Sequence, residues 1–116
     1  MIKNQLIYVA HPFGGDKANK YSIDTIMENL VMLDKNNTYL SPLHNFSILY
    51  FDTQYSKGLK ICLDMLNKCD ALVLCGEWET SKGCIGEWSF AIAKGMPIYT
   101  WKEWTDKLKE QGDNSR

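Results

Sequence analysis

Residues 71–99, ALVLCGEWETSKGCIGEWSFAIAKGMPIY, decide the fold of this 116-residue chain. The stretch begins with a short apolar run, residues 71–75, that is typical of a buried strand. A turn, a helical segment over residues 88–94 and a stop at Gly95 follow, and a second strand is expected around residues 96–100. A strand, a helix and a strand in that order predict one unit of a parallel sheet.

Glu87 is the unusual residue of this stretch, because it is the only acid between Ser81 and Lys102 and its neighbours are mostly small or apolar. A carboxylate in apolar surroundings is normally paired, hydrogen-bonded or used in chemistry, since burying its charge is costly. An acid at the start of a helix can also simply offset the peptide dipole. The loop of residues 76–86 should lie at the carboxyl end of its strand, where parallel sheets place their sites. Glu87 is therefore the first active-site candidate.

Further strands and helices extend this unit toward both ends of the chain. Strands are expected where β-forming apolar residues run together, and helices where apolar residues recur at spacings of three and four. Residues 44–53 fit a short helix over the site entrance or an irregular loop equally well, and a polar, frayed tail should end the chain. The expected strands span residues 6–10 and 38–42, and the expected helices residues 17–36, 55–68 and 104–110.

This alternation predicts an α/β protein with a Rossmann-like, doubly wound parallel sheet of four or five strands, ordered 2-1-3-4 through its middle. One domain should span residues 1–116, with its core over about residues 5–110. The first and third strands would be neighbours, so the loop of residues 8–15 should meet the loop of residues 81–87.

Composition excludes several classes of function. The net charge is -1, so broad electrostatic capture of a nucleic acid polymer or of a membrane surface is not expected. The four cysteines form no CxxC pair and the two histidines stand far apart, which gives a zinc site little support. No run of residues approaches membrane-spanning length. We expect a cytoplasmic protein with reduced cysteines and no cofactor.

Gly14 and Gly15 precede the first long helix. Free backbone amides at a helix start suit a phosphate or another anion. Two glycines before a helix also simply make a turn, and the pair is not a full GxGxxG motif. Phosphate binding and a plain turn both remain open here.

The chain resembles the nucleoside 2-deoxyribosyltransferase superfamily, including its deoxynucleoside 5'-monophosphate N-glycosidases. The segment 76–83 also resembles small uncharacterised relatives that are common in phage and bacterial genomes. The resemblance spans roughly residues 6–100, and it implies a Rossmann-like fold and an N-glycosidic reaction. The matching positions are Tyr8 within residues 8–13, Asp64 six residues before Asp70, the run 70–74, and Ser81, Gly83 and Glu87 followed by Ala91, Gly95 and Pro97.

The resemblance implies three catalytic residues. Glu87 matches the family's nucleophile, which attacks the anomeric carbon of the sugar and forms a glycosyl-enzyme intermediate. The start of its helix should keep Glu87 ionised, and Tyr8 should aim it through a hydrogen bond. Asp64 matches an acid that faces the nucleobase, and its helical phase lies close to the apolar side of its helix. An acid in a helix is more often simply solvated.

Substrate choice depends on Ser81 and on the loop after the first strand. Transferases of unphosphorylated nucleosides often carry an aspartate where this chain has Ser81, whereas the monophosphate hydrolases carry a serine, whose neutral hydroxyl tolerates a 5'-phosphate. The hydrolases also have an arginine before the two glycines, where this chain has Phe13. Lys17 or Lys82 could supply the missing charge.

The remaining candidate contacts are aromatic and glycine residues near the site. His11, Phe13 and Trp78 could stack on a base or ribose, although Trp78 serves equally well as a packing or subunit-contact residue. Together with Gly14, Gly15, Ser81 and Gly83 they form the expected substrate-binding set. The expected partner is a small nucleoside or nucleotide, and the chain should form a homo-oligomer, a dimer or larger. The alternative function is a non-catalytic protein that senses or sequesters a nucleotide.

Overall fold

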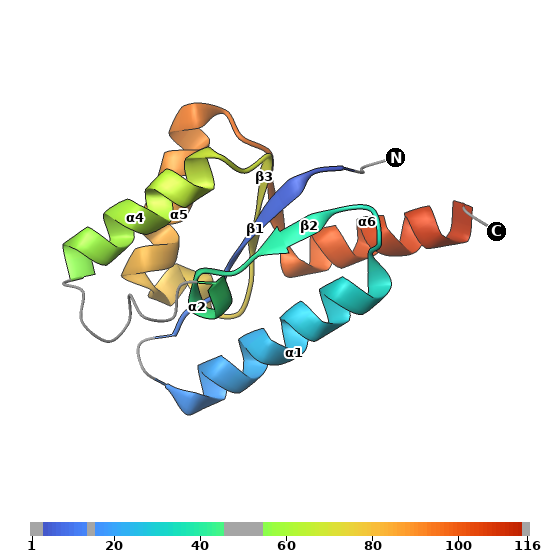
Figure 1. The fold of residues 1–116 in the computed structure, drawn as a ribbon, viewed down its shortest axis with the longest axis horizontal. Coiled ribbons are helices and arrows are strands. Elements are labelled where there is room, and N and C mark those ends of the chain that lie inside the picture. The colour runs from blue at the N-terminus through green and yellow to red at the C-terminus, as the bar shows by residue number, and fades with distance from the viewer. Residues whose placement is uncertain (1–3, 14–15, 46–54, 115–116) are drawn as a thin grey trace.

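The computed structural model describes residues 4–13, 16–45 and 55–114 (Figure 1). Its strands and helices alternate along the chain, as the periodicity predicts. In chain order they are β1 (Leu6–Ala10), α1 (Lys17–Leu33), β2 (Thr38–Leu40), α2 (Pro42–Asn45), α4 (Tyr55–Asn67), β3 (Ala71–Leu74), the 3-10 turn η1 (Trp78–Thr80), α5 (Lys82–Lys94), β4 (Ile98–Thr100) and α6 (Trp101–Asn114).

The described strands form one parallel sheet in the order β2-β1-β3-β4. The register pairs Tyr8 with Leu40 on one side and with Leu72 on the other, so β1 is a central strand. The predicted class and strand order are therefore confirmed. The carboxyl ends of β1 and β3 lie side by side, since Ala10 pairs with Leu74.

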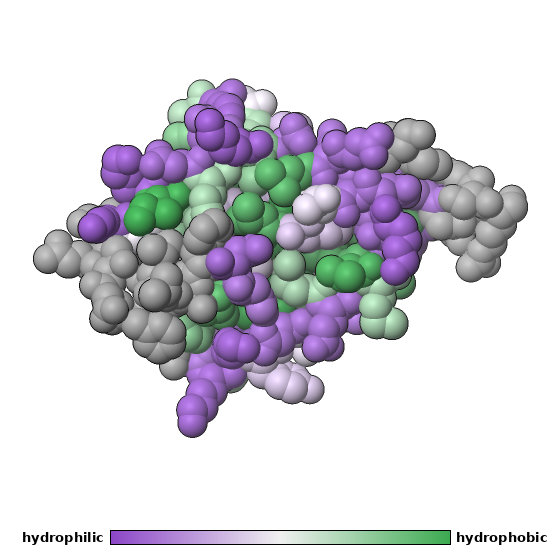
Figure 2. Space-filling view, in the orientation of Figure 1, coloured by the Kyte–Doolittle hydropathy of each residue, from purple (hydrophilic) through white to green (hydrophobic). Residues whose placement is uncertain are grey.

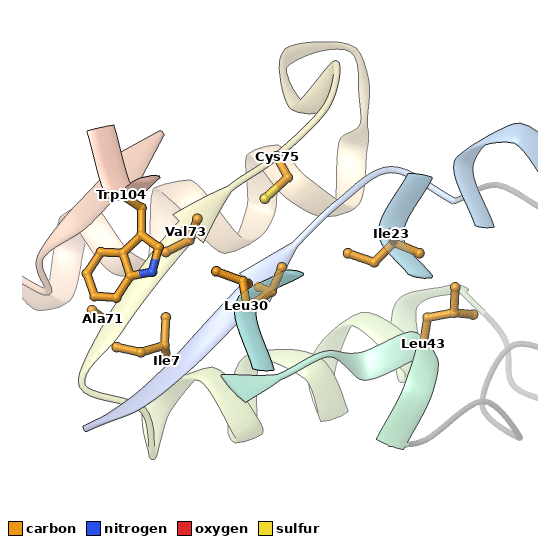
Figure 3. Packing of buried hydrophobic residues seen from close by; sticks show 9 residues of the cluster. Ile7, Ile23, Leu30, Leu43, Ala71, Val73, Cys75 and Trp104 are labelled. Atoms are coloured by element: carbon orange, nitrogen blue, oxygen red, sulfur yellow. The ribbon is translucent and has the colours of Figure 1, made fainter. Parts of the chain in front are cut away.

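Helices cover both faces of the sheet, and alternate strand residues point to opposite faces. Ile7, Val9 and Val73 pack with Leu30 of α1 and Trp104 of α6 on one face (Figures 1 and 3). The intervening residues pack on the other face, against α4 and α5. That second cluster includes Tyr8, Ala10, Leu72, Leu74, Leu66, Cys84 and Ala91.

Two helix boundaries differ from the expectation. α1 ends at Leu33, not near Asn36, because Asp34 leaves the helical conformation and its carboxylate accepts a hydrogen bond from the Asn36 amide at 2.9 Å. α6 begins at Trp101, three residues before the expected start. Thr100 and Glu103 form a reciprocal capping box there, with each side chain accepting from the other's amide. The expected frayed tail is helical through Asn114.

The helix that carries Glu87 also begins earlier than expected, at Lys82. Ser81 caps it, and the Ser81 hydroxyl accepts from the Cys84 amide at 3.2 Å. Gly95 ends the helix in the left-handed conformation with φ 76°, which confirms the predicted stop. Glu87 is consequently the sixth residue of α5 and lies in its second turn.

Hydrophilic side chains line the rim of the face seen in Figure 2, with hydrophobic groups gathered near its middle. Within the described ranges, no helix combines the length and the apolar character that a membrane span needs.

Candidate active site

Tyr8 and Glu87 form the centre of the candidate site. β1 directs Tyr8 toward α5, and the second turn of α5 directs Glu87 back toward β1. Tyr8 is fully buried and Glu87 is 7% exposed. The Tyr8 phenol donates a hydrogen bond to Glu87 Oε2 across 79 positions of sequence. The structure therefore brings together two of the three residues expected to be catalytic.

Burial dominates the electrostatics of this pair. Desolvation raises the pKa of Glu87 to about 7, and the hydrogen bond from Tyr8 opposes that rise. Desolvation, followed by the charge of Glu87, raises the pKa of the Tyr8 phenol well above its usual value, so the phenol stays protonated. The expectation that the helix start keeps Glu87 ionised needs correction, because the dipole acts mainly within the first turn and Glu87 lies beyond it. Glu87 instead titrates near neutral pH.

Cys62 of α4 is a third member of the centre, and it packs with Tyr8 in the cluster on this face of the sheet. Its thiol lies within hydrogen-bonding reach of the Tyr8 phenol, and burial and the charge of Glu87 raise its pKa. The Cys62 thiol therefore stays protonated beside the hydrogen-bonded pair of Tyr8 and Glu87. The available signal was the position of Cys62 on the helix face that packs against the sheet.

A small cavity at the carboxyl end of β1 opens beside Glu87. It is lined by the end of β1, by residues 11–13, by Ile23 of α1 and by residues 41–43. Its volume is about 30 Å³, room for about one or two water molecules. Small-molecule sites usually enclose about 300–1,000 Å³, so a nucleoside needs a wider opening than the described residues enclose.

His11 and Phe13, two of the substrate-binding candidates, line this cavity. The His11 ring is held from two sides, with Nδ1 at 2.7 Å from the Pro12 carbonyl oxygen and Nε2 at 2.9 Å from Ser22 Oγ. A carbonyl only accepts, so Nδ1 carries the proton and Nε2 of the neutral ring accepts from Ser22. Gly76 packs against this ring, since a Cβ there would lie 2.8 Å from Nε2.

Asp64 does not join the site. Its side chain is 67% exposed and pairs with Lys60 one turn earlier on α4, at 3.0 Å. The expectation that Asp64 shares the apolar side of its helix is wrong, because Cys62 takes the inward position and residues two apart project to different sides of a helix. The structure leaves Asp64 on the surface.

The other expected contacts surround the start of α5. Ser81 is occupied as the N-cap of this helix, and Gly83 lies in its first turn. Trp78 packs against Trp88 with ring centroids 6.0 Å apart and ring planes tilted by 40°, which fits the packing interpretation of this residue. Gly14 and Gly15 lie outside the described residues. Among the described residues, no three His, Cys, Asp or Glu side chains gather as a metal ion would require.

Two solved structures share the fold of this chain. The structure is similar to a 2-deoxyribosyltransferase from Leishmania mexicana, with TM-score 0.58 and 24% identity over 83% of this chain and 63% of that one. It is also similar to a conserved protein from Enterococcus faecalis V583, with TM-score 0.68 and 24% identity over 83% of this chain and 62% of that one. The chain therefore has the nucleoside 2-deoxyribosyltransferase-like fold, and it spans less than two thirds of either protein.

Sequence comparison shows the family of this chain. Residues 5–100 match the model of a family described as a domain of unknown function, DUF4406, and the chain belongs to this family. No curated protein matches the chain significantly. At 24% identity the two structural likenesses show the fold alone.

Proposed function

We propose that this protein cleaves or transfers at the N-glycosidic bond of a deoxynucleoside, or of its 5'-monophosphate, with Glu87 as the nucleophile. The observation that carries the proposal is the buried, Tyr8-bonded carboxyl of Glu87 beside a cavity at the carboxyl end of β1. A buried carboxyl with a strongly raised pKa and a specific partner is a functional-site candidate. The similarity to a 2-deoxyribosyltransferase supports the same reaction class.

The reaction divides into two halves. In the first, a Glu87 oxygen bonds to the anomeric carbon, the bond to the base breaks, and its electron pair leaves with the base. In the second, water or another base attacks the anomeric carbon, and the electron pair of the ester bond returns to Glu87. Tyr8 aims the carboxylate and stabilises its charge through the hydrogen bond. Hydrolysis and transfer differ only in the acceptor.

The departing base needs a proton or an equivalent hydrogen bond. Asp64 is the proposed acid on the resemblance alone, and its exposed position beside Lys60 makes it the weakest assignment. Asp64→Asn decides the matter. A fall in the rate of base release, with the affinity for substrate unchanged, supports the role, whereas an unchanged rate removes Asp64 from the mechanism.

Substrate class can be tested with matched pairs of compounds. The neutral hydroxyl of Ser81 tolerates a 5'-phosphate, so we propose a 5'-monophosphate as the preferred substrate, with Gly14, Gly15, Gly83, His11, Phe13 and Trp78 as further candidate contacts. Each 2'-deoxynucleoside is compared with its 5'-monophosphate at equal concentration. A higher kcat/KM for the free nucleosides would overturn this preference.

The decisive experiment follows the release of free base from such a panel by chromatography. Glu87→Gln keeps the size of the side chain and its ability to accept from Tyr8 but removes the nucleophile, so release should fall by at least about a thousandfold. Glu79→Gln on the exposed turn η1 is the matched control and should retain wild-type activity. Release that survives Glu87→Gln would refute the nucleophile assignment. An added acceptor base separates transfer from hydrolysis.

A second function is a binding protein without turnover. The surface position of Asp64 favours it, because it leaves the departing base without an acid. Thermal-shift measurements with nucleotides, including cyclic and ADP-ribose-type ligands, test this alternative. Stabilisation by a nucleotide that is recovered intact would support binding alone, and product formation would exclude it.

We also propose that the protein is a homo-oligomer, a dimer or larger. α5 exposes an apolar stripe formed by Ile85, Trp88 and Ile92, which are 40%, 37% and 57% exposed. Their spacing of three and four residues places them on one side of the helix that carries Glu87. Light scattering at micromolar concentration tests the assembly, and a strictly monomeric species would contradict it.

A further inference from the structure

A chain of hydrogen bonds outside the Tyr8–Glu87 pair links a serine, a histidine and an aspartate. Ser41 follows β2, His44 lies on α2 and Asp24 lies on α1. Ser41 Oγ lies 2.8 Å from His44 Nδ1, and His44 Nε2 bonds to Asp24 Oδ1. Residues of these three types in hydrogen-bonded series are the arrangement that activates a hydroxyl group.

The partners fix the direction of the bonds. Lys20 Nζ lies 2.6 Å from Asp24 Oδ2, and the hydrogen bonds from Lys20 and then His44 lower the pKa of Asp24, so this residue is a carboxylate. A carboxylate only accepts, and His44 Nε2 therefore carries a proton. When the ring is neutral, Nδ1 is then an acceptor, and the Ser41 hydroxyl donates to it. The lone pairs of Ser41 Oγ are left to accept from another donor.

The chain runs from the cavity to the surface. Ser41 is 1% exposed and lines the cavity that Glu87 also lines. The side chains of His44 and Asp24 are 32% and 34% exposed. The cavity volume of about 30 Å³ fits about one or two water molecules. A water between Glu87 and Ser41 would thus have Ser41 as its proton acceptor. His44 and Asp24, which are partly exposed, would then connect that proton to solvent.

We propose that Ser41, backed by His44 and Asp24, takes the proton from the water that resolves the glycosyl-Glu87 intermediate. This inference rests on the proposed function. The water oxygen bonds to the anomeric carbon while the ester bond to Glu87 breaks and returns its electron pair to the carboxylate. The water proton passes to Ser41 Oγ, and the hydroxyl proton of Ser41 passes to His44 Nδ1. Asp24 stabilises the imidazolium, which then releases a proton to solvent.

The competing interpretation is purely structural. The Ser41 carbonyl accepts from the amides of His44 and Asn45, and Asn45 Oδ1 accepts from the Ser41 amide at 3.0 Å, so the same residues help to form α2. A structural role predicts that substitutions change stability and leave the second half of the reaction untouched. The two interpretations therefore differ in kinetics.

The test separates the two halves of the reaction with Ser41→Ala and His44→Gln. Each variant should release about one equivalent of base per chain in a burst and then turn over about a hundredfold more slowly than wild type, because only the second half needs the general base. Azide should restore turnover, since this anion attacks without losing a proton. Thr25→Ala is the control. Thr25 follows Asp24 on the exposed side of α1 and its hydroxyl donates to the Tyr21 carbonyl, outside the chain of hydrogen bonds, so this variant should keep wild-type turnover.

A spectroscopic measurement guards against variants that fail to fold. In Asp24→Asn, the Lys20 ammonium holds the amide oxygen, so the amide NH₂ faces His44 Nε2 and moves the ring proton to Nδ1. Nitrogen-15 NMR of the His44 ring should show Nε2–H in wild type and Nδ1–H in Asp24→Asn, with turnover lost in parallel. An Nδ1–H ring in the wild-type protein would overturn the inference.

The two proposals fail in different ways. A wild-type protein that releases no base would overturn the proposed function itself. A wild-type protein that turns over, together with Ser41→Ala and His44→Gln variants that match its steady-state rate or gain nothing from azide, would overturn the relay alone.

Discussion

Glu87 holds its position at the expense of stability. The folded state keeps the proton of Glu87 up to about pH 7, whereas an unfolded chain loses it near the ordinary value of 4.5. Between these values the unfolded state binds fewer protons, so the free energy of unfolding falls as pH rises. The free energy of unfolding changes by about 1.4 kcal/mol per pH unit, so ionising Glu87 between its ordinary and its raised pKa costs the fold roughly 3 kcal/mol. A group kept at this cost is better explained by chemistry than by packing.

Glu87→Gln should therefore stabilise the fold at neutral pH. The amide cannot ionise, so the free energy of unfolding should rise by about 1–3 kcal/mol at pH 7.5 and by almost nothing at pH 4. Urea denaturation at both values measures the difference. Glu79→Gln, on the exposed turn η1, should show no such pH dependence. A destabilised Glu87→Gln variant at pH 7.5 would contradict the assignment of a desolvated carboxyl.

Tyr8→Phe should move the pH profile of the reaction. The phenol lowers the pKa of Glu87, so its removal should raise that pKa above about 7 and shift the acidic limb of kcat/KM toward higher pH. A hydrogen bond to a charged group contributes about 1.5–3 kcal/mol, so kcat/KM at pH 7 should fall on the order of tenfold or more. An acidic limb that stays in place would separate Tyr8 from the ionisation of Glu87.

Glu87 could be predicted from the pattern of its segment, whereas its hydrogen bond with Tyr8 was expected only from the resemblance to the deoxyribosyltransferase superfamily. Tyr8 is in a short apolar strand, and Glu87 is the only acid of a long segment. The surface position of Asp64 could not be predicted in the same way. Apolar spacing gives the direction of a helix face only approximately, so it did not show that Cys62 points inward and Asp64 outward. No role at the site could be predicted for Cys62. A cysteine on an apolar helix face has the same sequence pattern whether it only packs in the core or also lies beside a phenol.

At the scale of elements, strands and helix centres were predicted better than helix ends. Periodicity locates the middle of a helix, whereas caps decide its limits through single hydrogen bonds. The capping box of Thr100 and Glu103 and the cap at Ser81 start α6 and α5 earlier than apolar spacing indicates. Recognising Ser81 as a cap also shows that Glu87 is in the second turn, which changes the electrostatic argument.

Ser81→Ala should destabilise α5 by about 1 kcal/mol through loss of the cap, whereas Ser81→Asp should keep the cap and its stability. If Ser81 also faces a 5'-phosphate, Ser81→Asp should lose activity on monophosphates selectively, because the two negative charges repel. Thermal denaturation and kcat/KM for a nucleoside and its monophosphate measure the two effects separately. Equal losses on both substrates would confine Ser81 to the capping role.

Gly76 links the loop after β3 to His11. Gly76 and Gly95 both have positive φ, 63° and 76°, so an alanine at either should cost about 1 kcal/mol. Only at Gly76 would the new Cβ meet the His11 ring, whereas nothing lies within 4 Å at Gly95. Gly76→Ala should therefore reduce base release severalfold beyond its effect on stability, and Gly95→Ala should leave turnover unchanged. Equal activity in both variants would remove His11 from the site.

At the scale of the whole molecule, the topology could be predicted because alternating strands and helices leave few arrangements for right-handed, unknotted crossovers. That topology alone brings the ends of β1 and β3 together and so places Tyr8 near α5. The network of Asp24, His44 and Ser41 could not be predicted, because it depends on how α2 lies against α1. Such packing between non-adjacent segments leaves no periodic signal in the chain.

The apolar stripe of α5 gives the molecule a surface that suits a second copy. Trp88 packs against Trp78 with ring centroids 6.0 Å apart, so its side chain is already ordered and its contact with a partner would cost little side-chain entropy. Trp88→Glu puts a charge in the middle of the stripe and should convert the oligomer to monomers in light scattering at micromolar concentration. Met32→Glu is the control, because Met32 is an equally apolar residue, 72% exposed, on α1. If Met32→Glu dissociates the assembly and Trp88→Glu does not, the interface lies on α1, and the partner would then be remote from Glu87.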